Sequence, residues 1–509
     1  MARPCWRCGA TAVTPTPTVF SPPPRDLATL LASNEIPSDS DMPVLRKRIT
    51  EGQAQVDALN AHITELQTML GRLIAERDQI SDLVHQYESA VSTVRRLPQD
   101  LVCEILGLLS RGSRRMGRES IDAPPWVLAQ VCRSWRHAAL TYGSLWSTIE
   151  ISPLSTSPDI IEAQLQRSGD ALLQIYCYRL NSKYDVHPRV LELIVSQSHR
   201  WRTLHLKQIG LNADLSWLWP TNNRLAALES LWVYSPAQTV VPDVFSTAGQ
   251  LRRVVLSGEG SRMESPFVAV PWSQVTHYRG RYPAERQRDI LSLAANLVEC
   301  AIGDTTTASG EPITLPHLRR LIITENHFLD NLTTPNLTEL HVSDTDFDPY
   351  IFPFIARSSL SSTLTKLILS CVTLPPALVA TLAALPTLTY LLIETSLGGP
   401  KTQTALFEAL ALPESENPLE AGTLPNLETL IYGYPPGSAF PASPFFNMLR
   451  SRSGRLRHVR VFGELPSIGL ASGLSALREA GVDASFVRNT TWSAVFGEGK
   501  VGERVFNLV

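Results

Sequence analysis

The sequence lacks a dominant charge of either sign: 45 Lys and Arg stand against 48 Asp and Glu in 509 residues, for a net charge of −3. A general nucleic-acid-binding protein would carry a strongly basic surface, so we expect no nucleic-acid partner. Cysteine is also scarce, and the seven cysteines are scattered and odd in number. They form no disulfide framework, which favours reduced thiols and an intracellular protein, cytoplasmic, nuclear or both.

Long apolar segments are missing as well. Met1–Phe20 has no continuous apolar core of the kind that a secretion signal needs. The stretch most similar to a membrane span, Leu367–Ile393, carries no Asp, Glu, Lys or Arg. Its prolines, Pro375, Pro376 and Pro386, would break a helix repeatedly. We therefore expect a soluble protein with no membrane partner.

Catalytic motifs are absent from the sequence too. It contains no G-x-x-x-x-G-K-[ST], no G-x-G-x-x-G, no G-x-S-x-G and no H-E-x-x-H. Cys5-x-x-Cys8 is half of a zinc site, with no second pair nearby. Asp344, Asp346 and Asp348 imitate part of a calcium loop, but a proline follows, and the glycine and glutamate of such a loop are missing. The sequence thus predicts no enzyme, no cofactor and no bound metal.

The first part of the chain divides into a tail and a long helix. Residues 1–43 are rich in Pro, Thr and Ser, which favours a disordered tail with a short helical turn at Asp26–Leu31. Over residues 44–94, fifteen positions recur in alternating steps of four and three, and all but Gly52 and Arg77 are apolar. This spacing over seven heptads predicts a coiled-coil helix. The apolar residues of this seam are Leu45, Ile49, Val56, Leu59, Ile63, Leu66, Leu70, Leu73, Ile80, Val84, Tyr87, Val91 and Val94.

An apolar seam of this length is unfavourable in water and needs a partner. The partner is a second copy of the chain, another protein, or another part of the same chain. A homodimer through residues 45–94 and packing back onto the chain are equally open at this point, because one narrow seam does not identify its partner.

Residues 95–150 predict a small all-α module. Leu97-Pro98 places proline at the first helical turn, where its missing N–H costs nothing, and Leu101, Ile105 and Leu108 follow at helical spacing. Ser110–Ala123 is rich in Arg, Gly and Ser and predicts a loop. A second helix is expected from near Pro125. A core this small usually needs a partner or a neighbouring domain for stability.

The order of motifs in this module resembles the F-box family. Leu97-Pro98 is followed by Val131-Cys132-Arg133-Ser134-Trp135-Arg136 and then by Leu145-Trp146, and Asp100 occupies the family's acidic position. The loop between the helices is longer than in a minimal F-box. The resemblance implies that the module binds the Skp-type adaptor of an SCF ubiquitin ligase and, through it, a cullin–RING ligase. The residues that it implies for adaptor binding are Leu97, Pro98, Leu101, Ile105, Leu128, Val131, Cys132 and Trp135. The order of tail, heptad helix and module also resembles F-box proteins of mushroom-forming (basidiomycete) fungi.

Short β-like and helix-like runs alternate after the module. Strands are expected at Ser147–Ile151 and Leu172–Tyr178, and helices at Pro158–Ser168 and Pro188–Gln197. This alternation indicates parallel strands joined by right-handed crossovers.

Residues 151–509 repeat the template apolar-x-x-apolar-x-apolar. Most copies lie 19 to 29 residues apart, with an insertion expected around Gly398–Gly422. This resembles a degenerate leucine-rich-repeat array and implies an α/β solenoid with a curved parallel sheet. The consensus Asn after the strand is missing, so an ordinary α/β domain is the alternative. The copies begin at Leu228, Leu251, Leu297, Leu318, Leu337, Leu364, Leu388, Leu427 and Leu456, with variants at Trp201 and Trp272.

Variable residues between the strand leucines would project from the inner face of such an array. Trp, Tyr and Arg are the residues that most often anchor a protein partner. We predict a substrate receptor of an SCF ligase, which holds its target near the ubiquitin-loaded enzyme and needs no chemistry of its own. A protein-interaction scaffold without ligase function would use the same residues. The predicted target-binding residues are Trp232, Arg253, Arg320, His341, Lys366, Tyr390 and Arg460.

Overall fold

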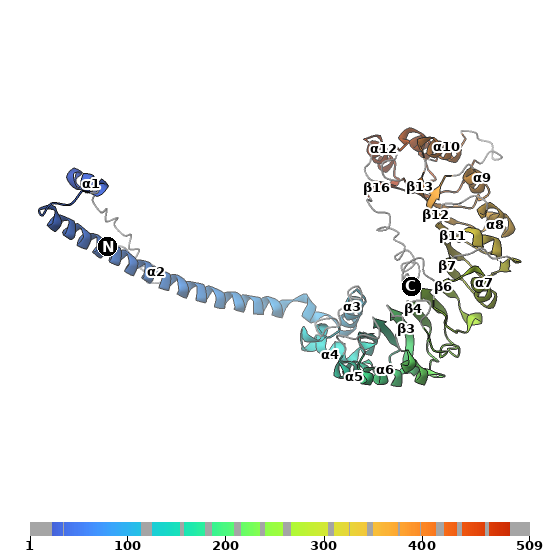
Figure 1. Cartoon of the computed structure of the whole chain (residues 1–509), viewed down its shortest axis with the longest axis horizontal. Coiled ribbons are helices and arrows are strands. Elements are labelled where there is room, and N and C mark those ends of the chain that lie inside the picture. The colour runs from blue at the N-terminus through green and yellow to red at the C-terminus, as the bar shows by residue number, and fades with distance from the viewer. Residues whose placement is uncertain are drawn as a thin grey trace. The chain divides into compact units, whose positions relative to one another are not determined.

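The computed structural model shows two compact units, Met1–Pro98 and Gln99–Val509, and we describe each by itself (Figure 1). The structure describes residues 23–33, 35–112, 125–152, 157–178, 186–207, 215–234, 240–257, 266–303, 310–324, 326–343, 350–374, 377–397, 399–413, 422–434, 440–452, 454–463 and 468–488.

The first unit contains the short helix α1 (Arg25–Ala32), the long helix α2 (Asp41–Val91) and one 3-10 turn, η1 (Thr93–Arg96). Ser38 stabilises the start of α2, because its backbone N–H and its hydroxyl both donate to the Asp41 carboxylate. The helix ends where Ser92 turns into an extended conformation. The predicted heptad helix is therefore present, shifted about three residues toward the N-terminus, and no residue of α2 is buried.

The tail predicted over residues 1–43 is only partly described. Residues 1–22, with Cys5 and Cys8, lie outside the described residues. The helical turn expected at Asp26–Leu31 is present as α1, and α2 begins inside the predicted tail at Asp41. Two segments of this region are thus helical, although their composition predicts disorder.

The second unit begins with a helical module, of which the described residues form four elements. These are α3 (Gln99–Gly112), η3 (Leu128–Gln130), α4 (Arg133–Thr141) and η4 (Gly143–Trp146). The second helix starts at Arg133 and not near Pro125, because Cys132 is extended and its Sγ accepts the Trp135 N–H at 3.5 Å as an N-cap. Ser110–Gly112 of the predicted loop belong to α3, and the rest of that loop lies outside the described residues. The buried apolar residues of the module include Val102, Leu106, Ala138, Ala139, Leu145 and Trp146.

A parallel sheet of fourteen strands forms the rest of this unit. Each strand pairs with the strands of the preceding and following repeat, with no reversal of order. A doubly wound α/β domain would reverse its strand order, so the alternative of an ordinary α/β domain is excluded for the described residues and the array is a solenoid. The strands are β1 (Thr148–Ile151), β2 (Leu173–Tyr178), β3 (Trp201–Lys207), β4 (Ser230–Tyr234), β5 (Arg253–Ser257), β6 (His277–Arg281), β7 (Glu299–Gly303), β9 (Arg320–Ile323), β11 (Glu339–Ser343), β12 (Lys366–Thr373), β13 (Tyr390–Leu397), β14 (Thr429–Gly433), β15 (His458–Gly463) and β16 (Asp483–Arg488). A separate pair consists of β8 (Ile313–Thr314) and β10 (Leu332–Thr333).

Helices and 3-10 turns connect these strands. Figure 1 shows the strands along the inner side of an arc and the helices along its outer side. The helix predicted at Pro158–Ser168 has these same bounds. The helices are α5 (Pro158–Ser168), α6 (Pro188–Ser196), α7 (Ala284–Leu293), α8 (Ile351–Arg357), α9 (Ala377–Ala383), α10 (Pro400–Leu410), α11 (Ala442–Ser451) and α12 (Ile468–Glu479). The 3-10 turns are η5 (Ser198–Arg200), η6 (Ser216–Thr221), η7 (Trp272–Gln274), η8 (Asn326–Asn331) and η9 (Leu360–Ser362).

The strand register confirms most of the predicted repeat frame. Leu321, Leu340 and Leu367, each the second apolar residue of its template, are aligned across neighbouring strands. All three are fully buried in the core between the sheet and the outer elements. The predicted insertion contains α10 but no additional strand of the sheet, since β13 pairs directly with β14.

One repeat frame was wrong. The variant placed at Trp272 lies three residues too early, because Tyr278 is aligned with Cys300 and Val275 therefore opens the repeat. Gly280 takes the third apolar position of this repeat. A Cβ at Gly280 would collide with the ring of Tyr278, so the tyrosine fills the space that a third apolar side chain occupies in other repeats.

The helical module continues directly into the sheet through Trp146. The Trp146 indole N–H donates to the Ala139 carbonyl at 2.7 Å. The side chain of Gln164 on α5 donates to the carbonyls of Trp146 at 3.4 Å and of Thr148 at 2.6 Å. The Arg167 guanidinium lies 4.4 and 4.5 Å from the ring centroids of Trp126 and Trp146. The boundary expected between residues 150 and 151 therefore falls within β1, and module and sheet share one compact unit.

We predict that Trp146→Ala lowers the free energy of unfolding by about 3–5 kcal/mol, because it leaves a cavity where the module meets the first repeat. Trp219→Ala is the matched control, since Trp219 is 54% exposed whereas Trp146 is fully buried. The control should change the free energy of unfolding by about 0.5 kcal/mol or less. Urea unfolding followed by circular dichroism measures both variants, and equal losses would contradict the role given to Trp146.

Candidate functional site

Helix α3 carries two apolar stripes. Val102 and Leu106 are buried in the module. Leu101, Ile105 and Leu108 follow the spacing of a second helical stripe, on which Leu101 and Leu108 are more than half exposed and Ile105 is half-buried. The module therefore presents apolar side chains that its own core does not use.

The eight predicted adaptor-binding residues differ in exposure. Pro98, Leu101, Val131 and Cys132 are exposed, and Leu97, Ile105 and Trp135 are half-buried. Leu128 is buried and contributes to the module's core. Leu97 and Pro98 belong to the first compact unit, and the other six residues belong to the second. Cys132 also has a structural task as the N-cap of α4.

Other exposed apolar residues of the module were not among the predicted residues. Leu108 and Leu109 continue the helical spacing of Leu101 and Ile105, and this spacing was the signal that could have added both to the predicted residues. No comparable signal marks Val127 and Leu140, which lie in a short segment and near the end of α4. These exposed residues are Leu108, Leu109, Val127 and Leu140.

The inner face of the sheet carries the predicted target-binding residues. Alternate residues of a strand point to the same face, so each strand offers one residue to a first row and the residue two positions later to a middle row. Arg253, Arg320, Lys366 and Tyr390 lie in the first row, whereas Trp232, His341 and Arg460 lie in the middle row. From β4 to β15 these rows cross nine strand spacings, or roughly 43 Å. The candidates form an extended surface and do not converge on one pocket.

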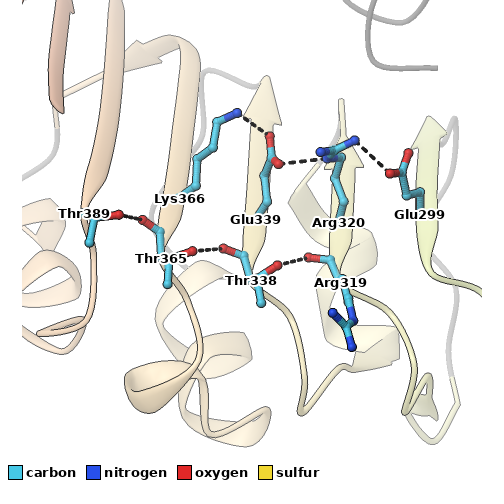
Figure 2. A network of polar contacts seen from close by, with 8 residues as sticks. All are labelled: Glu299, Arg319, Arg320, Thr338, Glu339, Thr365, Lys366 and Thr389. Carbon is cyan, nitrogen blue, oxygen red and sulfur yellow. Dashed lines mark hydrogen bonds and ion pairs between the residues drawn. The ribbon is translucent and has the colours of Figure 1, made fainter. Parts of the chain in front are cut away.

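A ladder of alternating charges follows the first row (Figure 2). Arg320 donates from Nη1 to Glu299 and from Nε to Glu339, both at 2.8 Å. Lys366 Nζ lies 2.8 Å from the other oxygen of Glu339 and 4.9 Å from the ring centroid of Tyr390. Two of the predicted basic anchors are thus paired within the chain.

Burial and the neighbouring charges shift the pKa values of the two glutamates of the ladder in opposite directions. Burial opposes ionisation of Glu339, but the hydrogen bonds and charges of Lys366 and Arg320 outweigh it and lower the pKa of this carboxyl. At Glu299 burial prevails over the charges of Arg320 and Arg253, and the pKa of that carboxyl is raised. Glu339 is therefore the firmly ionised member that holds two cations.

Sequence reasoning missed both glutamates. Glu299, Arg320, Glu339 and Lys366 each stand two positions after the first apolar residue of their repeat. The repeat frame alone places these four residues side by side. The predicted target-binding residues were aromatic or basic, however, and included no acidic residue. The signal was the alternation of sign at one template position.

A row of threonines runs along the strand starts beside this ladder (Figure 2). The hydroxyl of Thr338 donates to Arg319 O at 3.0 Å, that of Thr365 to Thr338 O at 3.1 Å, and that of Thr389 to Thr365 O at 3.2 Å. A groove of about 860 Å³ extends along part of this edge, with Thr338, Arg319 and Arg252 in its lining. Its lining side chains Thr338, Asn296 and Asn336 already donate to carbonyls of the preceding repeat, so the groove is primarily a structural edge.

The middle row begins with stacked rings. The ring centroids of Tyr176 and His205 are 4.3 Å apart, those of His205 and Trp232 4.8 Å, and those of Trp232 and Tyr234 6.3 Å. The Trp232 indole N–H donates to the Ser230 hydroxyl at 2.9 Å. Trp232 is buried, so it shapes the inner face and presents little of its own surface.

Apolar clusters continue the middle row. One comprises Trp232, Val255 and Ala301, and another comprises Leu392, Ile431 and Phe462. Both are separate from the main core on the other side of the sheet. The buried His341, whose Nε2 lies 3.1 Å from the Ser370 hydroxyl, and the exposed Arg460 are the predicted polar members of this row. An apolar middle row beside a charged first row suits recognition of a polypeptide surface.

Nothing in the described part of the chain gathers three His, Cys, Asp or Glu side chains in a way that could hold a metal ion. Asp344, Asp346 and Asp348 lie outside the described residues. Of the helices that are described, none combines the length and apolar character needed to cross a membrane. No protein-family model and no curated protein matches the sequence, so the functional argument depends on these residues themselves.

We predict that His341 makes the protein less stable in acid. Burial lowers the pKa of His341 to about 4, against the charge of Glu339 and with that of Lys366. Between pH 6.5 and about 4 the unfolded chain protonates this histidine while the folded protein keeps it neutral, so the free energy of unfolding falls with pH. In His341→Gln, the drop between pH 7 and pH 5 should be about 2 kcal/mol smaller than in the unsubstituted protein.

Urea unfolding at the two pH values measures this difference. His277 remains in both proteins and keeps part of the dependence, because burial and then Arg253 and Arg320 lower its pKa to about 4. His317→Gln, at an exposed position between β8 and β9, controls for the replacement itself. An equal drop in His341→Gln and the unsubstituted protein would contradict the assignment.

Proposed function

We propose that the chain is the substrate receptor of an SCF-type (cullin–RING) E3 ubiquitin ligase. The helical module, with Leu97 and Pro98 before it, binds the Skp-type adaptor, and the inner face of the solenoid binds a target protein. The observation that carries the proposal is the second apolar stripe of α3, in a module whose sequence resembles an F-box. An exposed apolar stripe of this kind is unfavourable in water and indicates a surface that binds a partner.

The exposed apolar side chains of the module are large enough for their burial to contribute to binding. Fully burying one such side chain contributes roughly 1.5–3 kcal/mol. Covering the half-exposed Leu101, Leu108 and Val131 would together contribute on the order of 3 kcal/mol. Further contacts of the module would add to this, as expected for a few apolar anchors within a larger interface.

The solenoid contributes a surface fitted to a protein target. Its inner face is long, its middle row is largely apolar, and its first row alternates in charge. A small-molecule site would instead be a concave pocket with a few convergent polar groups. We therefore assign target recognition to this face, with Arg253, Tyr390 and Arg460 as contact residues outside the internal ion pairs.

Such a receptor acts by proximity. Holding a target and a ubiquitin-loaded enzyme in one assembly raises the effective concentration of target lysines, and no residue of this chain takes part in bond formation. The proposal places the protein in the cytoplasm, the nucleus or both, where thiols such as Cys103, Cys132 and Cys300 stay reduced.

We predict that Leu101→Asp/Leu108→Asp weakens binding to a purified Skp-type adaptor by at least about thirtyfold, because two apolar contacts are lost and two charges would be buried. Leu293→Asp is the control: Leu293 on α7 is 60% exposed, close to the 62% of Leu108, but lies outside the module. Calorimetry with the full chain measures the affinities, and circular dichroism checks that each variant folds.

Two results would overturn the proposal. A folded, unsubstituted chain that fails to bind the adaptor removes the ligase function and leaves a protein-interaction scaffold. The same conclusion follows if the chain binds the adaptor, but a reconstituted cullin–RING ligase transfers no ubiquitin to proteins captured on the inner face. An equal loss of binding in Leu293→Asp would show that the α3 stripe is not the interface.

A further inference from the structure

The seam of α2 is an apolar stripe interrupted only by Gly52 and Arg77, and none of its residues within the helix is buried by the described part of the chain. Eleven of its residues within α2 are 46–69% exposed, and Met69, Ile74 and Leu83 beside them are also exposed. Charged pairs such as Lys47 with Glu51 and His85 with Glu88 lie off the seam, whereas Arg77, a seam residue, pairs with Asp78. The eleven seam residues are Ile49, Val56, Leu59, Ile63, Leu66, Leu70, Leu73, Ile80, Val84, Tyr87 and Val91.

We propose that α2 pairs with α2 of a second copy in a parallel, in-register, two-stranded coiled coil. This pairing does not depend on the ubiquitin-ligase function, because it uses only residues of the first compact unit.

The choice of side chains along the seam favours two parallel strands. With Ile49 and Val56 at a positions and Leu59 and Leu66 at d positions, the heptad assignment is fixed. Five of the seven a residues are then Ile or Val, and four of the seven d residues from Leu45 to Tyr87 are Leu. β-Branched residues at a with Leu at d are the combination that favours parallel dimers. A parallel dimer in register stacks like with like in every layer.

Arg77 is the one charged residue of the seam and limits the number of strands. It occupies an a position, where a long side chain can leave a two-stranded seam at its edge but would be enclosed in a larger bundle. In a parallel dimer the a residue packs beside the preceding g residue of the other helix, which is Glu76. Each Arg77 donates to Asp78 of its own helix and would also lie beside an opposite charge, Glu76, on the second copy.

Residues flanking the seam fit the same register. In a parallel dimer a g residue faces the e residue five positions later on the other helix. Met69 at g then meets Ile74 at e, and both are exposed and apolar. The charged Arg48 meets Gln53, and Glu76 meets Ser81, so no like charges face each other in these pairs.

The area is sufficient for a stable dimer. A fully exposed aliphatic side chain offers roughly 60–120 Å² of apolar area, taken from its transfer free energy per unit area. Two copies of eleven half-exposed residues would bury on the order of 700–1,300 Å², before the flanking side chains are added. Stable protein interfaces begin near 1,000 Å². On the proposed function, such a dimer carries two target-binding faces and favours targets with two binding segments.

The mass of the full chain in solution is the first test. Light scattering should give twice the chain mass of 56.1 kDa at micromolar concentration. Leu59→Asp/Leu66→Asp should raise the dissociation constant at least about a hundredfold, since charges enter two buried layers in each helix. Ala61→Asp/Thr68→Asp has the same spacing and charge on the outer face and should change it less than about threefold.

The direction of pairing is the second test. An antiparallel dimer that sets Arg77 opposite Gly52 would also use much of the seam. A spin label at Ser89→Cys should lie less than about 30 Å from its copy in the parallel dimer and roughly 70 Å away in that antiparallel one. The unsubstituted chain, labelled in the same way, supplies the background from native cysteines.

These measurements either support or overturn the proposal. A monomer, a trimer, the long label distance, or a dimer that survives Leu59→Asp/Leu66→Asp would each overturn it. A dimer with the short distance that is lost only in the seam variant supports it. If a monomeric chain binds the adaptor, the proposed ubiquitin-ligase function stands and the proposed pairing of α2 is wrong.

Discussion

Each repeat of the solenoid buries its strand only when the next repeat packs against it, and the whole unit depends on this stacking. A strand such as β11 is paired on both edges, through Leu340 with Leu321 and Leu367. Its apolar residues face a core that continues through the whole array. The two end strands have one neighbour each, and the array has no stable isolated repeat. At the β1 end the helical module packs on the first repeat through Trp146 and Gln164, so the element proposed to bind the adaptor also closes the solenoid.

Polar groups between repeats follow the same spacing and explain how repeats of unequal length remain in register. Asn296, Asn336 and Asn426 stand directly before the first apolar residue of their repeats. Each donates its side-chain amide to a carbonyl of the preceding repeat, at 2.7–2.9 Å. The buried Arg452 donates to the carbonyls of Leu410, Thr423 and Leu424 and so joins the last residue of α10 to the start of the next repeat. The asparagine bonds fix the starts of three repeats, those of β7, β11 and β14, whatever the length of the segment that follows each strand.

The repeat frame was predictable because it depends on apolar spacing, and stacking forces that spacing on every strand. The sequence lacks the consensus Asn after each strand, which suggested a degenerate repeat. In the structure, asparagines that precede the strand bond to the neighbouring repeat instead. A template that expects Asn after the strand does not detect them. The frame at Tyr278 failed because a large ring beside Gly280 replaces a third apolar side chain. On α3 the sequence shows apolar residues at Leu101, Val102, Ile105 and Leu106, but only packing against α4 decides which stripe is buried. The heptad spacing of α2 was visible in the sequence, and the structure adds that no residue of this helix is buried, which is the basis of the proposed pairing.

On the proposed function, the charge ladder would affect the specificity of target binding more than its affinity. Because Glu339 holds both Arg320 and Lys366, a target group that draws one cation away leaves a partly buried carboxylate with less compensation. A target avoids this electrostatic penalty only if its own charges alternate in the order that complements the ladder. A ligand with one isolated charge would gain little binding free energy. Discrimination by penalties against wrong partners is a common means of selectivity in protein recognition. On the proposed function, the apolar middle row supplies the binding free energy, and the ladder selects among the polypeptides that could occupy it.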